Sequence, residues 1–168
     1  MIHFKKTQIG YQQAICTIDE LKLEVGQVYA LLGLNGAGKS ALLKSMAAQL
    51  PLLSGELLLN GFPVAQLQKD AATRARQISF VASHFDGVEH LLVQDYIGLG
   101  RLPYTNSFGR LSSSDEQAVS QVMEVLSIRH LAQKETRALS DGERQLVSLA
   151  RAFVQDTPIL LLDEPSSY

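Results

Sequence analysis

Residues 33–40 of this chain, GLNGAGKS, have the glycine, lysine and serine spacing of a phosphate-binding loop. The loop follows an apolar run at residues 27–33 and precedes a stretch with helical spacing of apolar residues. Gly33, Gly36 and Gly38 allow backbone angles closed to other residues, so consecutive amide N–H groups can curve around phosphate oxygens at the positive end of the helix. A strand, such a loop and a helix in this order predict an α/β fold with the parallel sheet and core of a P-loop nucleotide hydrolase.

The side chains of this loop have expected roles in binding a nucleotide. Lys39 is expected to reach the β- and γ-phosphates, and Ser40 to ligate magnesium. The alternative is a glycine-rich turn that Ser40 caps. The residues expected to contact the nucleotide are Gly33, Leu34, Asn35, Gly36, Ala37, Gly38, Lys39 and Ser40.

Strand-like and helix-like runs alternate along the chain. A strand is predicted at residues 27–33, followed by a helix at residues 40–50 that Pro51 stops. Turn residues bound two further predicted strands, at 54–61 and 76–83.

After the strand predicted at 76–83, the sequence pattern changes from strand-like to mainly helical. Residues 1–90 are predicted to be a β-rich core with the phosphate loop, residues 91–155 a helical subdomain inserted in it, and residues 156–168 a final strand segment. Ser114 and Gln117 have the spacing of a capping box for one helix. The predicted apolar face of that helix consists of Val119, Val122, Met123 and Leu126.

The last predicted strand, ILLLDEP from residue 159, ends in two carboxylates. It lacks period-two alternation, which is typical of a strand buried on both faces of a parallel sheet. Ligands of such sheets bind at the carboxyl ends of the strands, so Asp163 is expected to hold magnesium and Glu164 to orient or deprotonate the attacking water. The alternative is a polar strand end that leads into a proline turn.

Composition narrows the class of protein. The chain has 168 residues, 46% of them hydrophobic, which suits one globular domain. A net charge of −2 gives no basic field, so nucleic acid is not an expected partner. The single cysteine, Cys16, suits a reducing cytoplasm, and neither a secretion signal nor a membrane-spanning apolar stretch is recognisable, so work at a membrane would need a partner.

The segment LSDGERQ, residues 139–145, begins another predicted helix. Ser140 and Glu143 form a capping box, and the expected apolar face is Leu146, Leu149, Ala150 and Phe153. With the phosphate loop (Walker A) and LLLDEP (Walker B) in this order, the segment resembles the signature sequence of the ATP-binding cassette (ABC) family, usually Leu-Ser-Gly-Gly-Gln. The resemblance covers the whole chain.

The resemblance implies ATP and Mg²⁺ as ligands, an N-terminal antiparallel β subdomain, and two cassettes that close head to tail as a homodimer. Ser140 and Gly142 of one cassette would face the γ-phosphate held by the other. Tyr11 matches the aromatic residue on which adenine stacks, although an aromatic residue of an ordinary strand would look the same.

The resemblance also implies a biological setting. The segments GRLPYTNSFGRLSSSD and LSDGERQ are most similar to ATPase subunits of importers for iron-siderophore complexes, haem or cobalamin. Such a subunit hydrolyses ATP, binds a transmembrane permease and lies in the cytoplasm, peripheral on the inner face of the membrane. The alternatives are a soluble ABC ATPase without a transport role and a nucleotide-binding fragment without turnover.

Two residues depart from the family pattern. Asp141 replaces a glycine of the signature, and its carboxylate suits the helix dipole but repels a nearby phosphate, so we expect weaker binding at this half-site. Ser83 stands where the family has a glutamine that touches magnesium and links the ATP site to the permease. A serine hydroxyl is expected to reach the cation through a bridging water.

The end of the chain carries a further expectation. In the family, another strand lies between the phosphate-loop strand and LLLDEP, and its residues come later in sequence than residue 168. We therefore expect a truncated cassette, in which the strands at 28–32 and 159–162 lie about 9.6 Å apart and which by itself has little ATPase activity.

Overall fold

The computed structural model describes residues 1–85, 88, 90–105 and 109–164. Contacts divide the chain into two compact units, Met1–Gln77 and Ile78–Tyr168.

An antiparallel sheet with the strand order β2-β1-β3-β4 forms the first unit. Its strands are β1 (Ile2–Gly10), β2 (Ala14–Leu23), β3 (Ser54–Leu59) and β4 (Phe62–Pro63). Asn60 and Gly61 have φ values of +50° and +85°, which suit the two-residue turn between β3 and β4. The sheet confirms the N-terminal antiparallel β subdomain, and β3 with its turn confirms the strand predicted at 54–61.

Three helices accompany this sheet: α1 (Lys39–Met46), α2 (Val64–Lys69) and α3 (Ala71–Gln77). α1 contacts β1, and α2 contacts β3 and β4. α1 ends earlier than predicted because Ala48 adopts φ +56°, and the amides of Gln49 and Leu50 donate to the carbonyl of Lys44.

The strand predicted at residues 27–33 does not form. Val28 and Leu32 are 100% and 88% exposed, and no strand is assigned between β2 and β3. A strand is stabilised by ladder hydrogen bonds to a neighbour, and no described strand of the first unit pairs with this segment. The prediction was wrong. The spacing of about 9.6 Å expected between strands at 28–32 and 159–162 therefore does not apply, because residues 28–32 are not a strand.

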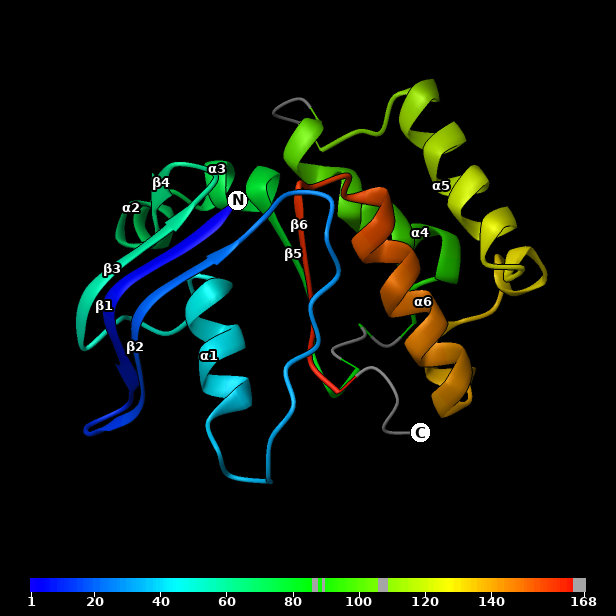
Figure 1. The fold of residues 1–168 in the computed structure, drawn as a ribbon. Coiled ribbons are helices and arrows are strands. Elements are labelled where there is room, and N and C mark those ends of the chain that lie inside the picture. Colours follow the sequence, from blue (N-terminus) through cyan, green and yellow to red (C-terminus); the bar gives the residue numbers. More distant parts are fainter. Residues whose placement is uncertain (86–87, 89, 106–108, 165–168) are drawn as a thin grey trace. The chain divides into compact units, whose positions relative to one another are not determined.

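Two parallel strands, β5 (Ile78–Val81) and β6 (Ile159–Leu162), form the sheet of the second unit, and they run side by side in Figure 1. β5 confirms the strand predicted at 76–83. In β6, Ile159 and Leu161 are buried whereas Leu160 is 37% exposed. The prediction that both faces are buried was therefore wrong, because the side chains of a strand alternate between faces and only one face of β6 is covered.

The other elements assigned in the described part of the second unit are helices, as predicted for residues 91–155. They are α4 (Val93–Gly98), η1 (Leu99–Tyr104), α5 (Ser113–Val125), η2 (Arg129–Leu131), η3 (Thr136–Ala138) and α6 (Asp141–Val154). α6 contacts β5, α4 and α5 (Figure 1). A buried apolar cluster that includes Val93, Tyr96, Ile97, Val119, Met123 and Val147 joins these helices. None of the helices in the described ranges is long and apolar enough to cross a membrane.

The capping box predicted at Ser114 and Gln117 lies two residues earlier than expected. Ser112 caps α5, and the amide of Asp115 donates to its hydroxyl while the Asp115 carboxylate accepts from the Ser112 amide. The apolar face of α5 is as predicted: Val119 and Met123 are buried, and Val122 and Leu126 are partly buried against the same cluster.

The apolar face predicted for α6 is partly wrong. Leu146 and Phe153 are 39% and 44% exposed, whereas Val147, Ala150 and Val154 are buried. The buried stripe begins one residue later than predicted, because Val147, Ala150 and Val154 are the α6 residues that join the apolar cluster of the second unit.

Candidate functional site

The predicted phosphate loop leads directly into α1. Gly36 and Gly38 have φ values of +81° and +91°, in the left-handed region that other residues rarely adopt. Gly33 is not in this region, and a Cβ atom there would lie at an ordinary 3.7 Å from the Cβ of Ala37. The special backbone angle is therefore confirmed at two of the predicted glycines, and the expectation for Gly33 was wrong.

Lys39 bends back onto the loop that precedes it. Its Nζ donates hydrogen bonds to the carbonyls of Gly33 and Leu34, each at 2.9 Å. A phosphate oxygen carries negative charge and accepts a stronger hydrogen bond from an ammonium group than a neutral carbonyl does. The ammonium of Lys39 can therefore exchange these two carbonyls for an anion.

The loop as a whole fits a nucleotide phosphate. Its N-cap residue is Gly38, so no capping side chain occupies the first amides of α1. The preceding residues, 31–37, are exposed. Ser40 adds a hydroxyl oxygen in the first turn of the helix, and oxygen is the ligand that Mg²⁺ prefers.

Tyr11 lies in the turn between β1 and β2 and is 62% exposed. The start of β2 touches the phosphate loop, because a Cβ atom on Gly38 would lie 2.6 Å from Cγ2 of Ile15. Tyr11 is thus near this contact along the chain, and its stacking on adenine stays a prediction.

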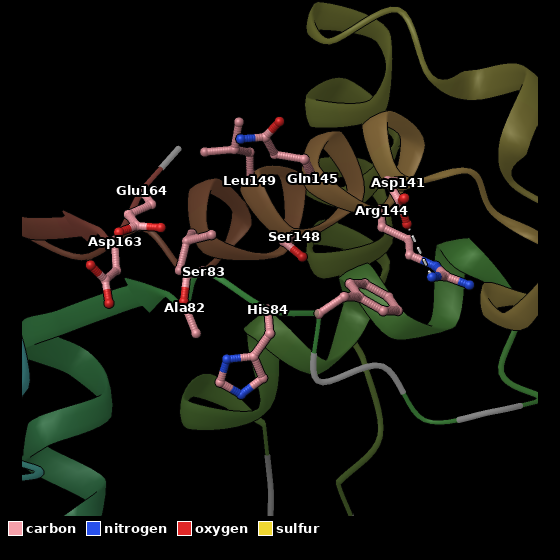
Figure 2. Close-up of a pocket in the computed structure, with 12 residues that line it drawn as sticks. Ala82, Ser83, His84, Asp141, Arg144, Gln145, Ser148, Leu149, Asp163 and Glu164 are labelled. Carbon is pink, nitrogen blue, oxygen red and sulfur yellow. Dashed lines mark hydrogen bonds and ion pairs between the residues drawn. The ribbon is translucent and has the colours of Figure 1, made fainter. Parts of the chain in front are cut away.

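A cavity of about 130 Å³ lies at the carboxyl ends of β5 and β6 (Figure 2). Asp163 follows β6 and is 7% exposed, and its amide extends the ladder by donating to the carbonyl of Val81 at 2.9 Å. Ser83 follows β5 and lines the same cavity. In Figure 2, Ser83, Asp163 and Glu164 lie at one end of this cavity, as expected for a site at the carboxyl ends of parallel strands.

These three side chains offer the chemistry predicted for them. Asp163 and Ser83 present a carboxylate and a hydroxyl to one cavity, a donor set that suits Mg²⁺. Glu164 is exposed and has φ +51°, a backbone conformation that is rare outside glycine and recurs at functional sites. A carboxylate in this place can orient or deprotonate a water molecule.

The N-terminus of α6 is held by the predicted capping box. The amide and the hydroxyl of Ser140 donate to Oε2 of Glu143 at 2.7 and 2.8 Å. Nζ of Lys134 lies 3.0 Å from each oxygen of the same carboxylate. The hydrogen bond from the Ser140 amide, with the Lys134 ammonium and the Ser140 hydroxyl, lowers the pKa of Glu143 from 4.5 to about 2, so this carboxylate stays ionised.

The two residues after Ser140 are exposed. Asp141 pairs with Arg144 through an Oδ1–Nη1 contact of 3.3 Å, which offsets part of its negative charge. A Cβ atom on Gly142 would meet nothing within 4 Å. Within the described part of the chain, neither a close contact nor a left-handed backbone angle requires a glycine at 142. The roles of Ser140 and Gly142 towards a nucleotide stay predictions.

Sequence reasoning missed Lys134 and Arg144. The pairing of Arg144 with Asp141 could have been found from their helical spacing of three residues. Lys134 comes from the connection between η2 and η3, so its contact with Glu143 follows no helical or strand period. Gln145 and Ser148 of α6 also line the cavity.

Comparison with known proteins agrees with this geometry. The family model described as ABC transporter matches residues 17–167. The chain is 36% identical, over 98% of its length, to the achromobactin transport ATP-binding protein CbrD of Dickeya dadantii, of which it covers 61%. It is 32% identical, over 95% of its length, to the iron(3+)-hydroxamate import ATP-binding protein FhuC of Bacillus subtilis, of which it covers 59%. The chain thus spans about three fifths of the length of these relatives.

Solved structures show the same fold. One is an inward-facing conformation of a transporter assigned to the metal-chelate type of ABC transporter, with 30% identity, a TM-score of 0.79, and coverage of 99% of this chain and 60% of that one. Another is the dimeric ATP-binding cassette MJ0796 bound to ADP and Pi, with 22% identity, a TM-score of 0.84, and coverage of 99% of this chain and 75% of that one. Because the family model matches most of its residues, the chain belongs to the ABC transporter family, as an ATP-binding cassette.

Proposed function

We propose that the gene product that carries this chain binds and hydrolyses ATP to drive an ABC importer. The observation that carries the proposal is the phosphate loop, with Gly36 and Gly38 in the left-handed region and Lys39 at the start of α1. This arrangement offers backbone amides, a helix N-terminus and one ammonium group to a polyphosphate.

In this proposal, different residues of the cassette bind the nucleotide, bind Mg²⁺ and activate the attacking water. Lys39 and the amides of residues 36–40 bind the β- and γ-phosphates, and the ring of Tyr11 stacks on adenine. Ser40, Asp163 and Ser83 supply oxygen ligands for Mg²⁺, which when bound would neutralise charge on the phosphates. Glu164 orients the attacking water and accepts its proton, which makes it the catalytic base.

Two further partners complete the proposal. A second copy of the cassette presents its Ser140 and Gly142 to the γ-phosphate, and the exposed position of both residues supports this role. A transmembrane permease holds the pair at the cytoplasmic face of the cell membrane. Nucleic acid has no part in the proposed function.

Iron-siderophore complexes are the substrate class that we propose. The support comes from the relatives, one of which is named for iron(3+)-hydroxamate import and another for achromobactin transport. Haem and cobalamin are the alternatives within the same importer type.

A second candidate is a cassette that binds ATP with little turnover, and the departures at Ser83 and Asp141 favour it. For residues 1–168 by themselves we propose this low-turnover state, because residues 27–33 are exposed and do not form the strand that would support the phosphate loop.

Phosphate release separates these candidates. In the full-length gene product, purified with the membrane protein that accompanies it, Glu164→Gln is expected to lower the rate by about a hundredfold or more while ATP binding is retained, since only the base is removed. Glu124→Gln, which changes an exposed carboxylate of α5, is the matched control and should leave the rate unchanged. Residues 1–168 alone should release phosphate far more slowly than the full-length protein. Equal rates for Glu164→Gln and the unsubstituted protein would contradict the assignment of the base, and an inactive full-length protein would favour the binding-only candidate.

A further inference from the structure

The hydroxyl of Ser140 has one proton, and the capping box already uses it. Oγ of Ser140 donates to Oε2 of Glu143 at 2.8 Å, and the Ser140 amide donates to the same oxygen. Phosphate oxygens only accept hydrogen bonds, so Ser140 can bind a phosphate through its hydroxyl only if that proton leaves Glu143. The carboxylate of Glu143 therefore competes with a phosphate for the serine.

Glu143 also carries a charge of the same sign as the phosphate. If the serine hydroxyl turned away, an unbalanced carboxylate would remain close to the anion and would repel it. The cost of this repulsion depends on which cation stays with the carboxylate.

Lys134 is that cation. Its Nζ lies 3.0 Å from both carboxylate oxygens, and the two side chains are only 35% and 27% exposed. The backbone of Lys134 is fixed independently of α6, because its amide donates to the carbonyl of Leu131 at 2.8 Å and its carbonyl accepts from the amide of Val93 at 2.9 Å. The ammonium group therefore approaches Glu143 from a separate, anchored segment.

We propose that Lys134 is a positioning residue for Ser140: it holds and neutralises the Glu143 carboxylate, so that the serine hydroxyl is released to a phosphate. This inference rests on the proposed function, in which Ser140 faces the γ-phosphate of ATP bound by a second copy. Lys134 acts through Glu143 and does not itself touch the nucleotide.

The test is a double-mutant cycle on the full-length gene product assembled with its permease, read as kcat for ATP hydrolysis and as ATP affinity. Lys134→Met keeps the aliphatic stem and removes the charge, and it should lower kcat by about tenfold while ATP affinity at the phosphate loop changes by less than about twofold. Lys134→Arg should retain most of the activity. Arg129→Met removes an exposed cation of the same unit, which pairs with Glu124, and should behave like the unsubstituted protein.

The decisive comparison uses Glu143→Gln, which removes the charge that Lys134 balances. In that background Lys134→Met should have no further effect on kcat. If the lysine were needed only for folding, Lys134→Met would lower kcat in the Glu143→Gln background as well. Unchanged kcat in Lys134→Met, or an equal loss in both backgrounds, would overturn the inference while leaving the proposed function intact. An unsubstituted protein that does not hydrolyse ATP would overturn both.

Discussion

Ser83 and Asp163 are brought to one cavity although they are 80 positions apart in the sequence, because β5 and β6 are parallel neighbours with Val81 opposite Leu162. The sequence predicted both as magnesium ligands, and their meeting at the ends of adjacent strands supports the pairing. The serine side chain is shorter than that of the glutamine usual at this place in the family. Ser83 therefore reaches less far into the cavity than a glutamine would.

Ser83→Gln is expected to restore a direct link between the cation site and the permease. In the full-length gene product, phosphate release should rise more when the protein is assembled with the proposed permease than when it is purified alone, since in the proposed function a longer side chain at residue 83 would link the ATP site to that partner. His84→Gln introduces the same side chain at the next residue of the cavity lining and is the matched control. An equal rise with and without the permease would remove the coupling role from residue 83.

At the scale of the element, the start of α5 is fixed by an ion pair as well as by a cap. Nε of Arg101 lies 2.8 Å from Oδ1 of Asp115, and Nη1 of Arg101 donates to the carbonyl of Val154 at 3.0 Å. The Arg101 and Asp115 side chains are 17% and 8% exposed. The pair therefore joins η1, the first turn of α5 and the end of α6 in a largely buried place.

Acid should weaken this junction. Hydrogen bonds from the Ser112 hydroxyl and amide, and then from Arg101, lower the pKa of Asp115 from 3.8 to about 2. The stabilisation is therefore complete above pH 3.8 and is lost as the pH falls through about 2.

Asp115→Asn is expected to lower the free energy of unfolding at pH 7 by about 2 kcal/mol, because it removes a charged hydrogen-bond partner from a largely buried arginine. It should also flatten the loss of stability between pH 4 and pH 2. Urea unfolding followed by circular dichroism at several pH values measures both effects, and Glu116→Gln at the next, exposed position is the control. An unchanged acid slope in Asp115→Asn would contradict the role of this carboxylate.

Helix starts show what the sequence could and could not predict at this scale. The box of Ser140 and Glu143 was predicted correctly, since Ser140 is the one serine among residues 136–140, directly before α6. Residues 112–114 are all serines, so the sequence offered three possible caps, and the choice of Ser112 depends on Asp115, whose second oxygen binds Arg101. The buried stripe of α6 likewise depends on α4, α5 and β5, which pack against it. The sequence of α6 alone does not specify these neighbours.

At the scale of the whole molecule, the motifs along the chain could be predicted, whereas the pairing of one strand could not. The phosphate loop could be predicted because its glycine and lysine spacing is contiguous in sequence, and Gly36 and Gly38 adopt the left-handed backbone angles that this pattern predicts. The strand predicted at 27–33 could not, because a strand forms only beside a neighbour and an apolar run does not specify which segment that neighbour is. The family and the candidate site were therefore predictable from motifs, whereas the pairing of this segment was not.

The central claim is that the loop at residues 33–40 is a nucleotide site, and titration of the purified protein with a fluorescent ATP analogue tests it most directly. Lys39→Ala should weaken binding by about a hundredfold, since it removes the one ammonium group of the loop and leaves the glycine backbone intact. Lys44→Ala, a change of the same kind in the last turn of α1, is the matched control and should bind like the unsubstituted protein. Undiminished affinity in Lys39→Ala would contradict the claim and would mean that the loop has only a structural role.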